Sequence, residues 1–165
     1  MRITVTARPS FADKAASFRK LADTGIYEGL GRLAQEARDT ILGNLKDESP
    51  VYSGPDPRRQ GGDLRDSIDS RQYAHYGGGI TLNFIAQVPY AGFVIGGTQA
   101  HPIDPVNASV LVFYNSDGEL VFAKHVEHPG TQPNPFHVRA WEGSRADVLD
   151  TLSRTGREMI AMVSD

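Results

Sequence analysis

The histidines are the residues of this chain most able to do chemistry, and there are five of them. His125 and His128 stand three apart near the end of an expected strand, His101 lies in a preceding loop, and His137 opens the last helix. Three imidazoles around one zinc ion would make a hydrolytic centre. However, side chains three apart on a strand point to opposite faces, and the chain has no His-Glu-x-x-His pattern. A metal-dependent hydrolase is therefore an alternative, not the leading interpretation.

Other catalytic patterns are weaker. Asp63, Asp66 and Asp69 recur at steps of three and could bind a cation, but a helix cap and a solvated face explain them as well. No serine sits in a Gly-x-Ser-x-Gly elbow, and the absence of cysteine excludes thiolate catalysis, disulfides and cysteine-based zinc sites. The glycine runs at 77–79 and 96–97 do not match a phosphate-binding loop. We expect no enzyme, no bound metal and no cofactor.

Composition limits the remaining classes. A chain of 165 residues has the size of one domain, and we expect a single domain over 1–165. Its net charge of −3 gives no global reason to bind nucleic acid or an anionic membrane. The first residues lack the apolar run of a signal peptide, and no stretch reaches the length of a membrane span. We expect the chain to be made in the cytoplasm and to bind no membrane.

The first half of the chain predicts one strand and two helices. Residues 2–7 alternate between polar and apolar, as a half-buried strand does. Ser10 can cap a helix over 11–22. A longer helix over 26–45 follows, because one set of apolar residues recurs at helical spacing: Ile26, Leu30, Leu33, Ala37, Ile41 and Leu45.

The segment from 46 to 62 has no periodicity and is rich in proline and glycine. A loop of this length inside a domain is either functional or mobile. It carries the adjacent pair Arg58 and Arg59, which would suit a segment that contacts a partner, but loop residues of this kind more often form an ordinary solvated loop, the interpretation that the sequence alone favours. Asp63 is then expected to cap a short turn over 64–68.

Two β-hairpins are expected in the second half. Residues 69–76 and 79–88 are joined by three glycines, and 90–95 form one helical turn before a loop over 98–108. Val110–Tyr114 and Glu119–Val126 form the second hairpin. Its tip consists of turn-forming residues: Asn115, Ser116, Asp117 and Gly118.

The final element is a long helix. Prolines and glycine over 129–135 forbid regular structure, Asn134 is a good N-cap, and Pro135 suits the first helical position. One apolar face follows: Phe136, Ala140, Trp141, Val148, Leu152, Met159 and Val163. We expect Trp141, and likewise Tyr90, to pack in the core.

Together these elements predict an α+β fold. Four or five antiparallel strands, from the two hairpins and the N-terminal strand, pack as one sheet against two main helices, including the long C-terminal helix. Uncovered strand edges are ready pairing surfaces, which points to assembly with further copies.

Three fragments, taken in order, resemble one family. They are Gly62-Asp63-Leu64-Arg65-Asp66-Ser67-Ile68, the segment Tyr90–Thr98, and His128-Pro129-Gly130-Thr131 with Pro133-Asn134-Pro135-Phe136 and Ala140. In this order and spacing the chain resembles the head-tail joining or tail-completion proteins of long-tailed bacteriophages, also described as minor tail or neck proteins. Ile95 stands where that family usually has glutamate, so a polar contact there cannot be carried over.

The resemblance implies a virion protein of the neck, made in the host cytoplasm. It would form a ring with copies of itself, with six-fold symmetry expected, between the head connector and a tail-tube or tail-terminator protein. DNA would pass through transiently and without sequence specificity. A mildly acidic lumen would suit this passage, because carboxylates repel phosphates whereas lysine and arginine hold them. A tail terminator and a head-closure protein of the same neck are alternatives, and a small cytoplasmic binding module is a rival from another class.

We expect the assembly contacts in the 46–62 loop and at the second hairpin tip. These contact residues are Arg58, Arg59, Asn115, Ser116, Asp117 and Gly118. The family motif residues are expected to shape the fold instead: Gly62, Leu64, Ile68, Tyr90, Gly97, Thr98, Pro129, Gly130, Pro135 and Phe136.

Overall fold

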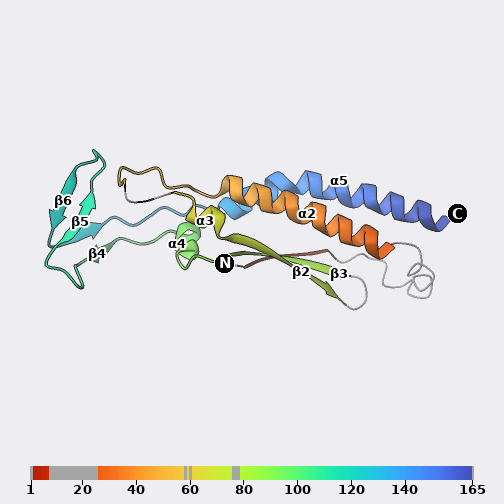
Figure 1. Ribbon diagram of the computed structural model, residues 1–165, viewed down its shortest axis with the longest axis horizontal. Coiled ribbons are helices and arrows are strands. Elements are labelled where there is room, and N and C mark those ends of the chain that lie inside the picture. The colour runs from red at the N-terminus through yellow and green to blue at the C-terminus, as the bar shows by residue number, and fades with distance from the viewer. Residues whose placement is uncertain (1, 8–25, 58, 60, 76–78, 165) are drawn as a thin grey trace.

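The protein is elongated, with two long helices and a sheet at one end and a β-hairpin at the other (Figure 1). The computed structural model describes residues 2–7, 26–57, 59, 61–75 and 79–164. The helix expected over 11–22 lies outside these residues. Among the helices that the structure describes, none is long and apolar enough to cross a membrane.

A three-stranded antiparallel sheet forms one layer of the helical end. It consists of β1 (Arg2–Ala7), β2 (Ile68–His75) and β3 (Gly79–Ala86), in the order β1-β3-β2. Phe84 in the central strand lies opposite Ile3 on one side and Ser70 on the other. Leu82 and Phe84 alternate along β3 and both are buried, so this strand supplies most of the sheet's part of the core, together with Ile68 at the start of β2.

Two long helices, α2 (Ile26–Glu48) and α5 (Phe136–Ser164), run antiparallel beside each other, and α2 lies against the sheet (Figure 1). Ala37, Ile41 and Leu45 recur every four residues and are buried, as the helical period requires. From α5, Phe136 and Ala140 complete the same core. These members of the two predicted apolar faces therefore share one core with Leu82 and Phe84 of β3.

Polar contacts fix the register of the two helices. Near the start of α5, Arg139 pairs with Glu48 over 2.8 Å. One turn along, the Asn44 amide donates to the hydroxyl of buried Ser144 over 2.8 Å, and that hydroxyl donates to the Ala140 carbonyl over 2.7 Å. Further along, Arg154 pairs with Glu36. The antiparallel alignment thus extends over most of both helices.

Two short helices connect these layers. In α3 (Asp63–Asp66), Leu64 is buried and anchors the turn that leads into β2. The second, α4 (Ala91–Gly96), follows β3 and contributes the buried Ala91. Asn134, just before α5, donates its backbone N–H to the Val94 carbonyl over 3.0 Å and so ties α4 to the beginning of α5.

The remaining strands form two small sheets away from the core. Strands β4 (His101–Ile103) and β7 (Val126–His128) pair with each other, as do β5 (Leu111–Tyr114) and β6 (Leu120–Ala123). The α+β class, both hairpins and the long C-terminal helix are confirmed. The strands, however, are divided among three sheets and do not form one sheet of four or five strands.

Several predicted boundaries were wrong by a few residues. Helix α2 continues to Glu48, so the loop begins at 49, and α5 begins at Phe136, one residue after the proline expected in its first turn. Gly62, with φ of 112°, takes the N-cap position of α3 that we expected for Asp63, and no side chain caps that helix.

Other corrections concern strands and burial. The 98–108 loop contains β4, a strand that its proline had concealed, although proline is tolerated on the free side of an edge strand. Tyr90 and Trp141, expected in the core, are 41% and 36% exposed.

Candidate assembly surface

A segment that we call the arm, residues 98–131, leaves the helical end of the molecule and returns to it (Figure 1). It contains β4 to β7. Its two ends meet at an isolated bridge, where Thr98 and Thr131 each donate a backbone N–H to the other's carbonyl, over 2.9 and 3.0 Å. The Thr131 N–H also lies 3.0 Å from the Thr98 hydroxyl.

Two glycines allow the chains to approach at this bridge. Gly97 and Gly130 have φ of 70° and 88°, the left-handed region that glycine tolerates. A Cβ on Gly97 would collide with the Thr131 carbonyl, and one on Gly130 would collide with the Thr98 carbonyl. Two of the three segments that carry the phage resemblance therefore meet at the base of the arm, where they shape the backbone.

The arm has no core. Across residues 92–135, all of which the structure describes, no residue is buried. None of the described core residues comes from this segment. The core residues lie in α2, α3, β2, β3, α4 and α5, and the last one before the segment is Ala91 and the first one after it is Phe136. The arm is thus held by hydrogen bonds and partial packing alone.

The hairpin β5–β6 is apolar on both of its faces. Leu111 and Phe113 on one face are half-buried. On the other, which we call the outer face, Val112 lies directly opposite Phe122, and Leu120 is two residues from Phe122. These three side chains are 42%, 64% and 46% exposed. A hairpin apolar on both faces is typical of one that is covered on both sides.

The hairpin tip is rigidly organised by Asn115. Its side-chain oxygen accepts the N–H groups of Asp117 and Glu119 over 3.0 and 2.8 Å, and Gly118 takes φ of 79°. Asn115 and Gly118 thus form the turn. Ser116 and Asp117 are exposed and remain available for contacts.

The loop after α2 reaches the hairpin tip. A Cβ on Gly118 would lie 3.8 Å from the Pro55 side chain, so the two segments expected to make assembly contacts are neighbours. The loop folds around Tyr52, whose ring lies 5.4 Å below the Arg59 guanidinium and whose hydroxyl accepts the Asp56 N–H. Arg58 lies outside the described residues.

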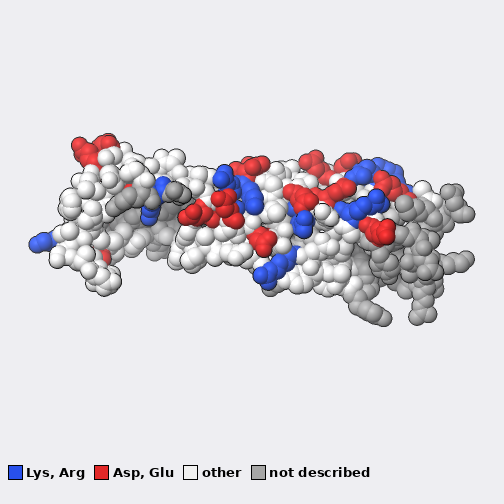
Figure 2. Space-filling model, viewed as in Figure 1, with Lys and Arg blue, Asp and Glu red and all other residues white. Residues whose placement is uncertain are grey.

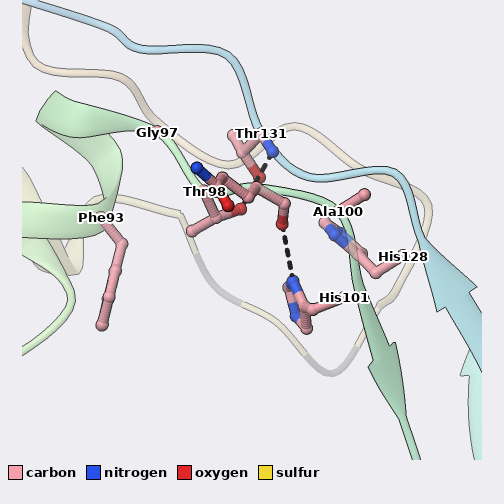
Figure 3. A pocket seen from close by; sticks show the side chains of 8 residues that line it. Phe93, Gly97, Thr98, Ala100, His101, His128 and Thr131 are labelled. Carbon is pink, nitrogen blue, oxygen red and sulfur yellow. Dashed lines mark hydrogen bonds between the residues drawn. The ribbon is translucent and has the colours of Figure 1, made fainter.

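A hollow of about 670 Å³ lies at the base of the arm (Figure 3). Phe93 extends from α4 along one side, and the imidazoles of His101 and His128 lie together on the other, with ring centres 5.0 Å apart. The remaining lining residues come from both arm ends: Gly97, Thr98, Gln99, Ala100 and Thr131. None of these eight residues is acidic.

Hydrogen bonds fix the roles of these two imidazoles. His101 Nδ1 lies 2.9 Å from the Gln99 carbonyl and must donate to it, whereas His128 Nδ1 accepts the Gly130 N–H over 3.0 Å. The neutral His128 therefore carries its proton on Nε2, where it is a donor and not a metal ligand. These hydrogen bonds disfavour a metal site formed by His101 and His128 in the hollow.

The other histidines lie apart from this pair. Both ring nitrogens of His125 contact carboxylates, Asp104 over 2.7 Å and Glu127 over 2.8 Å, and these hydrogen bonds raise the pKa of His125. Burial lowers the pKa of His137, whose Nδ1 has no partner among the described residues. Within the described part of the chain, no group of three histidine or acidic side chains could hold a metal ion.

Charge is unevenly distributed. The arm carries four acidic residues and one basic residue, so its net charge equals the −3 of the whole chain, and the rest of the chain is neutral. On the face shown in Figure 2, acidic and basic side chains intermingle over the helices, whereas the arm end is largely uncharged. The arm therefore combines an apolar surface with a few carboxylates.

The sequence patterns pointed to the hairpin tip and the loop as contact sites, but not to Phe93 or the outer face of β5–β6. The available signal was the composition of the hairpin strands, Leu111-Val112-Phe113-Tyr114 and Leu120-Val121-Phe122-Ala123, which are continuously apolar and do not alternate with polar residues. Comparisons with protein-family models, with curated proteins and with solved structures gave no match.

Proposed function

We propose that this chain is a structural subunit of a bacteriophage neck that forms a ring, joins the head connector to the tail and surrounds the DNA passage. The observation that carries the proposal is the arm. Across 92–135 no residue is buried, yet Phe93, Val112, Leu120 and Phe122 expose much of their apolar surface.

Such an arm is unfavourable in an isolated subunit. A two-stranded hairpin is marginally stable at best in water, and exposed apolar patches usually mark interaction sites. An assembly subunit resolves this, because neighbours bury the arm after assembly and about 25 cal/mol is gained per Å² of apolar surface removed from water. An enzyme's active site would not require these features.

The resemblance to neck proteins supports the same proposal through the arm junction. Two of the three similar segments, Tyr90–Thr98 and His128–Phe136, meet at the bridge between Thr98 and Thr131. The third contributes Leu64 and Ile68 to the core. The similar residues thus define where the arm leaves the helical end, which is the feature that assembly would use.

The distribution of charge fits a DNA passage. Carboxylates facing a lumen repel phosphates and let DNA slide, whereas a basic lumen would bind it through counterion release. The arm has a net charge of −3 and the rest of the chain is neutral, so neither part carries an excess of basic residues that would hold DNA. A reconstruction of the assembled neck showing a lumen lined by lysine and arginine would overturn this part of the proposal.

The test is negative-stain microscopy of lysates from the phage or prophage that carries this reading frame, with the frame interrupted. We expect DNA-filled heads lying apart from tails of normal length. Overlong tails would instead indicate a tail terminator, and heads that have lost their DNA would indicate head closure. Normal infectious particles would overturn a neck function.

The hydrolase alternative makes a separate expectation. If the histidines bound catalytic zinc, the protein purified without added metal would contain zinc in stoichiometric amount. We expect none, because the neutral His128 presents an N–H toward the hollow and His125 is held by two carboxylates.

A further inference from the structure

We propose that the outer face of the β5–β6 hairpin of one copy docks into the hollow at the arm base of a second copy, head to tail. This inference deepens the proposed function, on which it rests for the ring, by naming the contact between neighbouring subunits. Two exposed surfaces of the same chain, the outer face of the hairpin and the hollow, support this contact.

The first surface is the apolar outer face. Val112 and Phe122 lie opposite each other and Leu120 adjoins them on the same face, because residues two apart in a strand point to one side. Asp117 and Glu119 follow within the same hairpin and supply carboxylates at its edge. The hairpin therefore combines an apolar outer face with carboxylates at its tip.

The second surface is the hollow. Phe93 is 64% exposed on one side of it, and the His128 imidazole on the other side has its Nδ1 engaged by the Gly130 N–H, which leaves an Nε2–H donor. None of the lining residues that the structure describes is acidic. The hollow thus offers an apolar wall opposite a donor, which complements an acidic hairpin with an exposed aromatic ring.

The geometry favours a second copy as the occupant. Phe93 and Phe122 are the two most exposed aromatic residues of the described chain, at 64% each. Helix α4 lies at the base of the arm and β6 at its far end, so the two rings are separated within one subunit (Figure 1). A contact between two different surfaces of identical chains repeats from copy to copy, and it closes into a ring when the rotation permits.

The size of the contact predicts its strength. Three exposed apolar side chains cover much less than the roughly 800 Å² per partner of a stable interface. One contact alone should therefore be weak, and each subunit of a ring gains from making two of them. We expect a largely monomeric protein in dilute solution and association at high concentration.

The test uses the absence of natural cysteine. Gln99→Cys places a thiol at the hollow, and Val112→Cys places one beside Phe122 on the hairpin. We expect a mixture of the two variants, oxidised at high protein concentration, to form the mixed disulfide-linked dimer. Val106→Cys, at a 91% exposed arm position outside both surfaces, is the matched control for random collision.

Charge substitutions then establish the direction of the contact. Adding Phe122→Asp to the Val112→Cys chain, or Phe93→Asp to the Gln99→Cys chain, should lower the yield of mixed dimer roughly tenfold, the loss expected when an apolar ring contact is removed. In the control pairs, Phe122→Asp is placed in the Gln99→Cys chain or Phe93→Asp in the Val112→Cys chain. The yield of mixed dimer should then be unchanged, since each aspartate lies on a surface that its chain does not use in this dimer. Both phenylalanines are exposed, so unchanged circular dichroism verifies folding.

Several results would overturn the proposal. A mixed-dimer yield no greater than that with Val106→Cys would overturn the contact between the hairpin and the hollow. Efficient self-linking of Val112→Cys that Phe93→Asp does not affect would indicate a symmetric hairpin-to-hairpin contact. The neck function is tested separately, by the microscopy of lysates. If heads and tails lie apart but the mixed dimer does not form, the neck function stands and this contact is overturned. If the mixed dimer forms but the particles are normal, the contact stands and the neck function is overturned.

Discussion

Thr98 and Thr131 exchange both backbone hydrogen bonds although 32 residues of arm lie between them. The pair joins the strand that leaves α4 to the one that returns toward α5. Because the arm has no buried residue, this bridge and the adjacent glycines determine how the arm is oriented. An assembly contact at the far end depends on that orientation.

Replacing Gly130 by alanine should disrupt the bridge. The added Cβ would collide with the Thr98 carbonyl, and φ of 88° is strained for alanine, together about 1 to 3 kcal/mol locally. Hydrogen exchange should therefore show faster exchange of the Thr98 and Thr131 amides. Gly92→Ala is the control, since nothing lies within 4 Å of its added Cβ. Unchanged protection in the Gly130 variant would contradict the role given to this glycine.

The buried hydroxyl of Ser144 should stabilise the helix pair. Ser144→Ala leaves the Asn44 amide without the acceptor it contacts over 2.8 Å, at a cost of about 1 to 3 kcal/mol. Ser153 is the matched control, because its hydroxyl makes the same bond to the carbonyl four residues earlier but is exposed. Chemical denaturation of both variants should show a loss only for Ser144→Ala. Equal losses would mean that the bond to Asn44 contributes nothing.

The secondary structure of the helical end was predictable because its signals are local. Ile41 and Leu45 repeat with the helical period, and Leu82 and Phe84 alternate with the strand period. The separation of the strands into three sheets was not predictable. It depends on the bridge at Thr98 and on the register of β4 with β7, both of which join residues far apart in sequence.

The candidate surface was only partly predictable for the same reason. The tip residues Asn115 and Gly118 were visible because turn chemistry is local. The exposure of Phe122 was not, since an apolar residue in a hairpin is ordinarily expected to face a core. The structure shows that none of the described core residues belongs to this hairpin.

Phe136 and Phe122 should respond in opposite ways to truncation. Phe136 is 0% exposed at the junction of α5 with the sheet, so Phe136→Ala should destabilise the subunit by roughly 3 to 5 kcal/mol. Phe122→Ala, at a 64% exposed position, should leave the melting temperature of the isolated subunit within error of the wild type. A large loss for Phe122→Ala would show that the hairpin is covered within its own chain.

His125 should titrate above the ordinary histidine range. Its two ring nitrogens contact Asp104 and Glu127, and both contacts require donors, so the imidazolium is the form that satisfies them. The pKa of His125 is accordingly raised from 6.5, mainly by the hydrogen bond to Asp104 and then by that to Glu127. Asp104→Asn with Glu127→Gln should return it toward 6.5, as followed by the NMR shift of the ring proton. His137 should titrate below 6.5, because burial lowers its pKa.

The sign of the His125 shift fixes how the arm responds to pH. A folded-state pKa above the unfolded value favours the folded arm fully below pH 6.5, where both states are protonated, and this contribution is lost as the pH rises through the folded pKa. Amide protection in β4 and β7, corrected for the intrinsic exchange rate, should therefore decrease from mildly acidic to alkaline pH. His125→Ala should remove the dependence. A pH dependence that persists in this variant would have to come from another group and would contradict the assignment.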